Sequence, residues 1–162
     1  MPNPDHPDIR IRHTRHMEHM SEPEWHEFVL AGTRTAKVAT VRADGRPHVA
    51  PVWFTLDTHA PGGTEVVFST GEKSVKGRNL ARDPRVSICV DDQEPPFGFV
   101  ILTGEAVFDR DPDALLTWAT RLGSRYMGEE AGAEFGRRNA VPGELLVRVR
   151  VAGVVAERDL TG

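Results

Sequence analysis

The sequence predicts a mainly β protein, an antiparallel barrel flanked by α-helices. Short apolar runs rich in β-branched residues recur along the chain and are separated by turn signals, as in meander-like antiparallel folds. The few helical patterns do not alternate with the strands, as they would in a parallel βαβ sheet. With 162 residues, 39% of them hydrophobic and 27% charged, the chain can bury one substantial core. We expect an N-terminal arm over residues 1–20 and one barrel domain over residues 21–162.

The first predicted helix starts after Ser21. The segment Ser-Glu-Pro-Glu, residues 21–24, is a capping box with proline in the first turn. Trp25, Phe28 and Val29 follow as an apolar stripe at helical spacing, and Gly32 can end the helix.

A β-hairpin is predicted next. Residues 36–41 form the first strand, and Asp44-Gly45 supplies the turn, because both central positions of a type I′ turn need positive φ. The returning strand is predicted over residues 48–56. A glycine-rich loop at 61–63 then leads into another strand over residues 64–70.

Residues 66–90 are the most informative segment for function. An apolar strand ends at the hydroxyls Ser69 and Thr70, a short basic helix follows, and Asp83-Pro84 ends it before a second apolar strand. The basic residues of this helix and its approach are Lys73, Lys76, Arg78 and Arg82. Hydroxyls at a strand end, free N–H groups at a helix start and basic side chains suit a phosphate group. The segment therefore predicts a site for a phosphorylated cofactor.

The second half of the chain completes the barrel. Strands are predicted over residues 85–91 and 98–108, followed by a helix that opens with Asp111-Pro112-Asp113 and has an apolar stripe up to Leu122. A short helix is possible within residues 128–143. The last strand, from residue 145 to residue 155, alternates apolar and basic residues.

Composition excludes several classes of function. A net charge of −4 argues against general binding to nucleic acid or to an anionic membrane. No apolar run approaches the roughly 18 residues of a membrane span, and the N-terminus lacks the apolar core of a secretory signal. A single cysteine, Cys89, excludes a disulfide or a cysteine-based zinc site within the chain. We therefore expect a cytoplasmic protein.

Three histidines of the N-terminal arm, His13, His16 and His19, could share one face of a helix and bind metal. No carboxylate or cysteine in a folded pocket accompanies them in the pattern, so a solvated arm without a metal site is the preferred interpretation.

Three segments carry a family resemblance: GRPHVAPVWF, FSTGEKSVKGRNLARDPRVSICV and FVILTGEAVF. They resemble the pyridoxamine 5'-phosphate oxidase-like family, and the nearest branch is the deazaflavin (coenzyme F420)-dependent reductases of actinobacteria. The resemblance covers roughly residues 33–158. It implies a six-stranded split β-barrel, the FMN-binding split barrel, that forms a homodimer with two cofactors in clefts between the subunits.

The resemblance also implies site residues. Thr70 and Lys76 match phosphate ligands of the family, and residues 50–53 match the segment whose backbone lines the flavin or deazaflavin ring. The family often has arginine where this chain has Val75, so Lys73 or Arg78 would have to replace that contact. The candidate cofactor-binding residues are Ala50, Pro51, Val52, Trp53, Ser69, Thr70, Lys73, Lys76, Arg78 and Asn79.

Several of these residues also have a structural interpretation. Ser69 and Thr70 could cap the following helix, Asn79 could brace it, and Trp53 fits a core or a dimer interface better than a stacking contact with the ring. Four further residues have roles left open: His48 and Tyr126 could donate a proton to substrate, and Arg148 and Arg150 could meet an acidic cofactor tail or solvent. Arg85, after Asp83-Pro84, is expected to be structural.

No catalytic triad, HExxH sequence or paired acidic motif is present, so the chemistry is expected to come from the cofactor, and no catalytic residue is assigned. The favoured function is hydride transfer from reduced F420 to a small electron-poor acceptor such as a quinone, an enone or a tetrapyrrole. The alternatives are an FMN-dependent oxidase or reductase and a non-catalytic protein that binds flavin, deazaflavin or haem. Val75 favours F420, because FMN depends more on a compact phosphate pocket.

Overall fold

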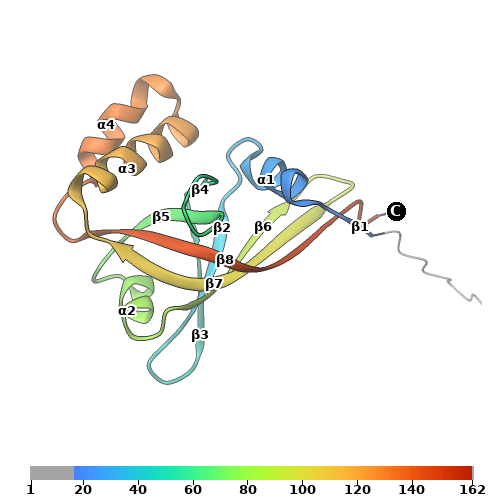
Figure 1. Ribbon diagram of the computed structural model, residues 1–162, viewed down its shortest axis with the longest axis horizontal. Coiled ribbons are helices and arrows are strands. Elements are labelled where there is room, and N and C mark those ends of the chain that lie inside the picture. The colour runs from blue at the N-terminus through green and yellow to red at the C-terminus, as the bar shows by residue number, and fades with distance from the viewer. Residues whose placement is uncertain (1–16, 162) are drawn as a thin grey trace, which may run out of the picture.

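The computed structural model describes residues 17–161 and shows one antiparallel sheet with four helices (Figure 1). Six strands match the six that were predicted. They are β2 (Ala36–Val41), β3 (Pro47–Val52), β5 (Glu65–Gly71), β6 (Arg85–Asp92), β7 (Gly98–Asp109) and β8 (Glu144–Arg158). Two short strands join them, β1 (Glu18–His19) and β4 (Thr55–Asp57). The mainly β fold with flanking helices is thus confirmed.

The strands follow the order β3-β2-β6-β7-β8-β5-β4, and β1 pairs with β8. The ends of this path, β3 and β4, do not pair with each other within the described residues, so the sheet stays open rather than closing into a complete barrel. β7 and β8 are the longest strands and cross the whole molecule as a twisted ribbon (Figure 1).

The predicted strand over residues 48–56 is in fact two strands. β3 ends at Val52, and β4 pairs with β5 instead of with β2. The break falls at Trp53-Phe54, where the fully buried Phe54 turns its backbone toward a helix. The Phe54 N–H donates to the Tyr126 hydroxyl at 3.2 Å, and the Phe54 carbonyl accepts from Arg125. Because the side chains of Tyr126 and Arg125 satisfy the backbone N–H and carbonyl of Phe54, this residue can leave the strand ladder without losing hydrogen bonds.

The end of the predicted N-terminal arm belongs to the domain. β1 pairs with β8 through Glu18 and His19, and Met20 is buried. The boundary at residue 20 is therefore too late by at least three residues. His13 and His16 lie outside the described residues, whereas the His19 side chain is 81% exposed.

Two of the four helices pack against the sheet individually rather than as a pair. α1 (Glu22–Leu30) begins with the predicted capping box, in which the Glu24 carboxylate accepts from both the backbone N–H and the hydroxyl of Ser21. α2 (Val75–Arg82) is the predicted basic helix and packs against β2, β3 and β5.

The other two helices form an antiparallel hairpin. α3 (Pro112–Met127) and α4 (Glu129–Asn139) lie together at the end of the sheet where β5 ends and β8 begins (Figure 1). They cross closely: a Cβ on Gly132 would lie 2.0 Å from the Ser124 hydroxyl, and one on Gly136 would lie 2.0 Å from the Thr120 hydroxyl. Glycine at both positions therefore lets the two backbones touch. The predicted short helix within 128–143 is confirmed as α4.

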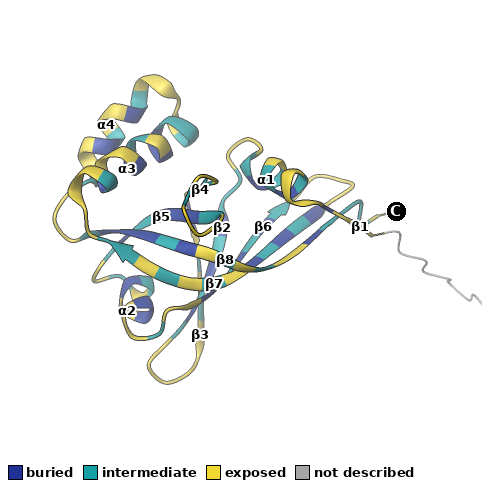
Figure 2. Ribbon diagram, in the orientation of Figure 1, coloured by how far each residue is buried: buried dark blue, intermediate teal, exposed yellow. Residues whose placement is uncertain are grey.

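Two apolar clusters hold β5 in place. Val66 and Phe68 point into the main core between the strands, while Val67 faces Leu115 and Trp118 of α3 in a smaller cluster. The alternation of buried and partly exposed residues along the strands is visible in Figure 2. Burial on both faces fixes the position of the end of β5, where Ser69 and Thr70 lie. No helix within residues 17–161 has the length and apolar composition needed to span a bilayer.

Candidate functional site

Six of the ten candidate cofactor residues line one cavity of about 300 Å³. They are Pro51, Val52, Trp53, Ser69, Thr70 and Lys76. The rest of the wall comes from the helical hairpin and the start of β8: Ala119, Leu122, Gly123, Phe135, Asn139 and Glu144. The end of β3, the end of β5, α2 and the α3–α4 hairpin thus converge on a single space.

Residues 70–77, which we call the cradle, contribute Thr70 and Lys76 to the wall of this cavity. The Thr70 and Ser74 hydroxyls lie 2.9 Å apart, and Ser74 caps α2 by accepting from the Gly77 N–H at 3.0 Å. The capping residue is therefore Ser74, which sequence analysis did not propose, rather than Ser69 or Thr70. The N–H groups of Val75 and Lys76 lie in the first turn, where helical N–H groups have no partner within the helix. The cradle can therefore offer hydroxyls, backbone N–H groups and the Lys76 ammonium to an anion.

Gly77 lets the start of α2 lie directly on the turn before it. A Cβ at this position would lie 2.4 Å from the Gly71 carbonyl oxygen and 3.0 Å from that of Glu72. The same turn is tied to the other side of the cavity, because the Glu72 N–H donates to the Gly143 carbonyl at 2.8 Å. The cradle is thus fixed both by its own helix and by the segment that precedes β8.

Glu144, the first residue of β8, brings a carboxylate to the cavity that sequence analysis missed. It pairs with Gly71, and a Cβ built on Gly71 would lie 3.6 Å from Glu144 Oε1. Burial raises the pKa of the Glu144 carboxyl, while the nearby Lys76 acts in the opposite direction. No sequence motif signals Glu144, because it reaches the cradle only through the pairing of β8 with β5.

The wall also includes Trp53 and Phe135, which form an aromatic cluster with Tyr126 behind them. The Trp53 and Tyr126 rings stack in parallel, with centroids 4.8 Å apart and an interplanar angle of 2°. Phe135 lies against Trp53 at 5.5 Å. Trp53 remains 37% exposed, so part of its ring borders the cavity. This cluster joins Trp53 to a helical hairpin that is distant in the sequence, which no local pattern predicts.

Tyr126 does not have the role of proton donor that sequence analysis left open. Its hydroxyl donates to the Arg34 carbonyl at 2.6 Å and accepts from the Phe54 N–H. Burial raises the pKa of the phenol. The neighbouring Arg125 donates to the carbonyls of Phe54, Val29 and Gly32. Both side chains therefore anchor α3 to the sheet.

Four candidate cofactor residues do not line the cavity. Lys73 and Arg78 are exposed on the segment that carries Lys76, and Ala50 is paired with Val38 in the ladder. Asn79 is 4% exposed, its Nδ2 donates to the Thr40 hydroxyl at 2.9 Å, and its Oδ1 accepts from Arg82. Asn79 therefore braces α2, the structural role considered for it from the sequence, and its assignment as a cofactor ligand stays a prediction.

His48 also lies outside the cavity wall. Its Nδ1 is buried and has no hydrogen-bond partner among the described residues. Burial lowers the pKa of this imidazole, and the charges of Arg42 and Lys76 lower it further. No neighbouring group is placed to activate it for proton transfer.

Arg148 meets neither a cofactor tail nor open solvent. Its guanidinium donates to the carboxylates of Asp57, Glu65 and Asp109, at 3.1, 3.3 and 3.0 Å. This ion-pair network holds β4, β5 and β7 to β8. Arg148 therefore has a structural role instead of the contact with a cofactor tail or with solvent that was considered from the sequence. Arg150 is exposed.

Arg85 has the structural role that was predicted. It forms a two-pronged ion pair with Asp83, at 3.0 and 2.7 Å, directly after α2. The hydrogen bonds from Arg85 lower the pKa of the Asp83 carboxyl to about 2.

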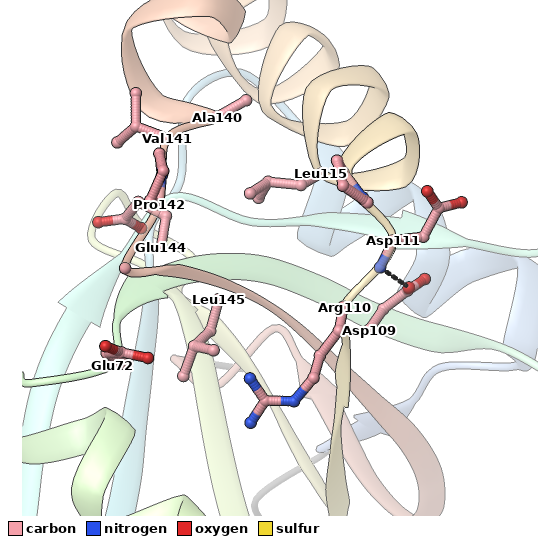
Figure 3. Close-up of a pocket in the computed structure, with 12 residues that line it drawn as sticks. Glu72, Asp109, Arg110, Asp111, Leu115, Ala140, Val141, Pro142, Glu144 and Leu145 are labelled. Atoms are coloured by element: carbon pink, nitrogen blue, oxygen red, sulfur yellow. Dashed lines mark hydrogen bonds between the residues drawn. The ribbon is translucent and has the colours of Figure 1, made fainter.

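A second cavity of about 270 Å³ lies beside the first and shares Glu144 with it. Figure 3 shows this space between the start of α3 and the connection from α4 to β8, with Leu115 and Leu145 in its wall. Glu72, Asp109 and Asp111 add carboxylates to its lining. None of the predicted cofactor residues belongs to it. Within residues 17–161, no group of three His, Cys, Asp or Glu side chains is arranged to hold a metal ion.

Comparison with known proteins places this geometry in a family. The sequence model of pyridoxamine 5'-phosphate oxidase matches residues 21–156. A conserved hypothetical protein of Mycobacterium tuberculosis, Rv2991, is 28% identical, with a TM-score of 0.73 and 86% of each chain covered. A protein described as an F420 reductase is 25% identical, with a TM-score of 0.60, covering 80% of this chain and 94% of its own.

A third structure extends the fold comparison. HutZ, a haem storage protein from Vibrio cholerae, is 24% identical, with a TM-score of 0.62, covering 84% of this chain and 94% of its own. At this identity the likeness concerns the fold alone. Because the family model matches most of the sequence and the same split-barrel architecture recurs in these structures, the chain belongs to the pyridoxamine 5'-phosphate oxidase family.

Proposed function

We propose that this protein is an oxidoreductase that uses reduced coenzyme F420 to transfer a hydride to a small electron-poor organic acceptor. The observation that carries the proposal is the single cavity whose wall contains both Thr70 and Lys76 of the cradle and the rings of Trp53 and Phe135. A phosphorylated cofactor with a flat ring needs both groups of residues at once. The similarity to a protein described as an F420 reductase supports the same choice.

The residues of the cavity fit such a cofactor. Lys76, Thr70 and the N–H groups at the start of α2 would hold the phosphate, and the backbone of Pro51 to Trp53 would border the ring. Pro51 has no N–H and lies on β3, an edge strand of the sheet, so it cannot donate a hydrogen bond to a ring or to another strand. When bound, F420 would supply a two-electron hydride donor, and the protein would bind, orient and shield it from water.

The charge distribution around the cradle favours F420 over FMN. Val75, in the first turn of α2, adds no positive charge to the phosphate end of the cavity. Lys73 and Arg78 lie outside the cavity but on the same segment, where their exposed side chains could meet the acidic tail of F420. FMN has no such tail and would gain nothing from them.

We propose further that the protein acts as a homodimer in which a partner subunit completes the site. The cavity of about 300 Å³ is at the lower end of the roughly 300–1,000 Å³ of ligand pockets, so one chain encloses such a cofactor only in part. The sheet also leaves apolar surface open: Val49 on β3 and Val107 on β7 are each 65% exposed. Light scattering of the purified protein should give twice the chain mass.

A non-catalytic binding protein is the second candidate. The haem storage protein HutZ shares the fold, so the architecture alone does not require catalysis. The favoured function predicts hydride transfer from reduced F420 to at least one member of a panel of quinones and enones. Saturating F420 binding without transfer to any of them would favour storage or sensing.

The test of the cofactor is a pair of fluorescence titrations of the purified protein with F420 and with FMN. We expect F420 to bind at least tenfold more tightly than FMN. Tight FMN binding without F420 binding would overturn the proposed cofactor and favour the FMN-dependent alternative.

A further inference from the structure

The cavity contains an acidic side chain where an anion is expected. Among its lining residues, Lys76 and Glu144 are the charged ones, and they carry opposite charges. The contributions of α3 and α4 are uncharged: Ala119, Leu122, Gly123, Phe135 and Asn139. An ionised Glu144 therefore cancels the charge of Lys76 at the site that would hold a phosphate.

The position of Glu144 is fixed by the fold. Its backbone pairs with Gly71 at the end of β5, one residue after Thr70, and its carboxylate lies over the Cα of Gly71. The hydrogen bond from the Glu72 N–H to the Gly143 carbonyl holds the two segments together immediately beside it. A phosphate seated on the cradle would therefore be a close neighbour of this carboxylate.

Glu144 is also without a partner that would neutralise it. Within residues 17–161 its side chain forms no hydrogen bond and no ion pair within 4.0 Å, Lys76 included. The other ionisable groups in the vicinity are His48, whose pKa is lowered in part by Lys76, Glu72 at the turn, and Asp109, Arg110 and Asp111 at the second cavity. The half-buried carboxyl has a raised pKa, which agrees with a poorly compensated charge.

The two candidate cofactors present different charges at this point. FMN is a phosphate monoester and carries about 1.5 to 2 negative charges near neutral pH, because the second ionisation of such esters has a pKa of about 6. F420 carries its phosphate as a diester, which has one negative charge. One lysine beside one carboxylate suits the smaller charge, and each additional charge on the phosphate increases the repulsion from Glu144.

We propose that Glu144 is a specificity-determining residue that makes the cavity prefer a phosphodiester to a phosphomonoester. The inference rests on the proposed function and identifies a residue that would select between the two cofactors. Lys76 supplies the attraction common to both, and Glu144 adds repulsion that is larger for the monoester.

The test compares the wild type with Glu144→Gln, which keeps the shape of the side chain and removes its charge. Fluorescence titrations at pH 7.5 with FMN and with F420 should show that the variant binds FMN about tenfold more tightly and F420 only about three- to fourfold more tightly, because the repulsion scales with the charge of the phosphate. Glu27→Gln is the matched control: it removes a carboxylate at an exposed position of α1 that does not line the cavity, so it should change either affinity less than twofold.

A second measurement uses pH. The ratio of the FMN dissociation constants of wild type and Glu144→Gln should rise between pH 5.5 and pH 7.5, because the phosphate of FMN gains its second negative charge over this range. An equal improvement for both cofactors, or no change for FMN, would overturn the inference while leaving F420 binding by the wild type intact. If neither protein binds F420 or FMN, the proposed function itself fails.

Discussion

The cradle and the aromatic cluster, which both contribute to the cavity wall, are built in different ways. The cradle comes from eight consecutive residues, and its side-chain hydrogen bonds join residues three or four positions apart. The aromatic cluster joins Trp53, which follows β3, to α3 and α4, and Tyr126 bonds to backbone groups 72 and 92 residues away. The cradle is therefore a local motif, whereas the aromatic cluster exists only when the whole chain has folded.

This difference predicts that substitutions in the cradle change ligand affinity, whereas substitutions in the aromatic cluster change the free energy of unfolding. In the cradle, Lys76 lines the cavity and its side chain forms no hydrogen bond or ion pair within residues 17–161, so a change at Lys76 should affect ligand affinity more than folding. The aromatic cluster and its anchors Arg125 and Tyr126 satisfy buried backbone carbonyls and N–H groups, so changes there should affect the free energy of unfolding. Four substitutions test this separation.

The largest expected effect is on stability and comes from Arg125→Met. The substitution leaves the carbonyls of Phe54, Val29 and Gly32 without their donor and removes the cation above the Phe54 ring. We expect a loss of about 3 kcal/mol in the free energy of unfolding, measured by urea denaturation. Arg137→Met, at an exposed position of α4, is the control and should change this energy by less than about 0.5 kcal/mol. A loss below about 1 kcal/mol for Arg125→Met would show that α3 is anchored mainly by apolar packing.

Lys76→Ala is the substitution in the cradle with the largest expected effect, and this effect is on ligand affinity. Removing a charge-assisted contact worth about 1.5–3 kcal/mol should weaken F420 binding more than tenfold, with the unfolding energy nearly unchanged. Arg46→Ala, at an exposed residue of the β2–β3 turn, controls for the loss of one positive charge. An unchanged affinity for Lys76→Ala would place the phosphate elsewhere.

Tyr126→Phe, in the aromatic cluster, should have a smaller effect on the free energy of unfolding than Arg125→Met. It keeps the ring stacked on Trp53 but removes the hydroxyl between the Arg34 carbonyl and the Phe54 N–H. We expect a loss of about 1–2 kcal/mol in unfolding energy. Hydride transfer should be retained, since this hydroxyl is bonded to the backbone. Loss of turnover with normal stability would return Tyr126 to a catalytic role.

The smallest effect concerns pH and Glu144. Because the pKa of its carboxyl is raised in the folded protein, the folded state holds the proton more tightly than the unfolded state does. Glu144 should therefore lower the free energy of unfolding as pH rises above about 4.5, the ordinary glutamate value, until the folded-state pKa is passed. Thermal unfolding of wild type and Glu144→Gln from pH 4 to pH 8 should show the variant gaining relative stability with pH. A difference in stability between the two proteins that does not change with pH would contradict a raised pKa for Glu144.

The same contrast explains which features could be predicted from the sequence. Strands, turns and the basic helix follow from periodicity and capping signals, and the cradle follows from residues adjacent in the chain. Glu144 could not be predicted, because the register of β8 against β5 places it beside Gly71. The break at Trp53-Phe54 was missed for a similar reason: the residues that satisfy Phe54 belong to α3. The partner of Asn79 could not be predicted either, because the packing of α2 on β2 turns its side chain toward Thr40.

Hydrogen–deuterium exchange of the wild type with and without saturating F420 tests most directly whether the cradle and the aromatic cluster form one site. We predict slower exchange in residues 70–78 and, in the same experiment, in the end of β3 and the α3–α4 hairpin. Protection confined to one of these regions, or to neither, would contradict a single cofactor site that joins them.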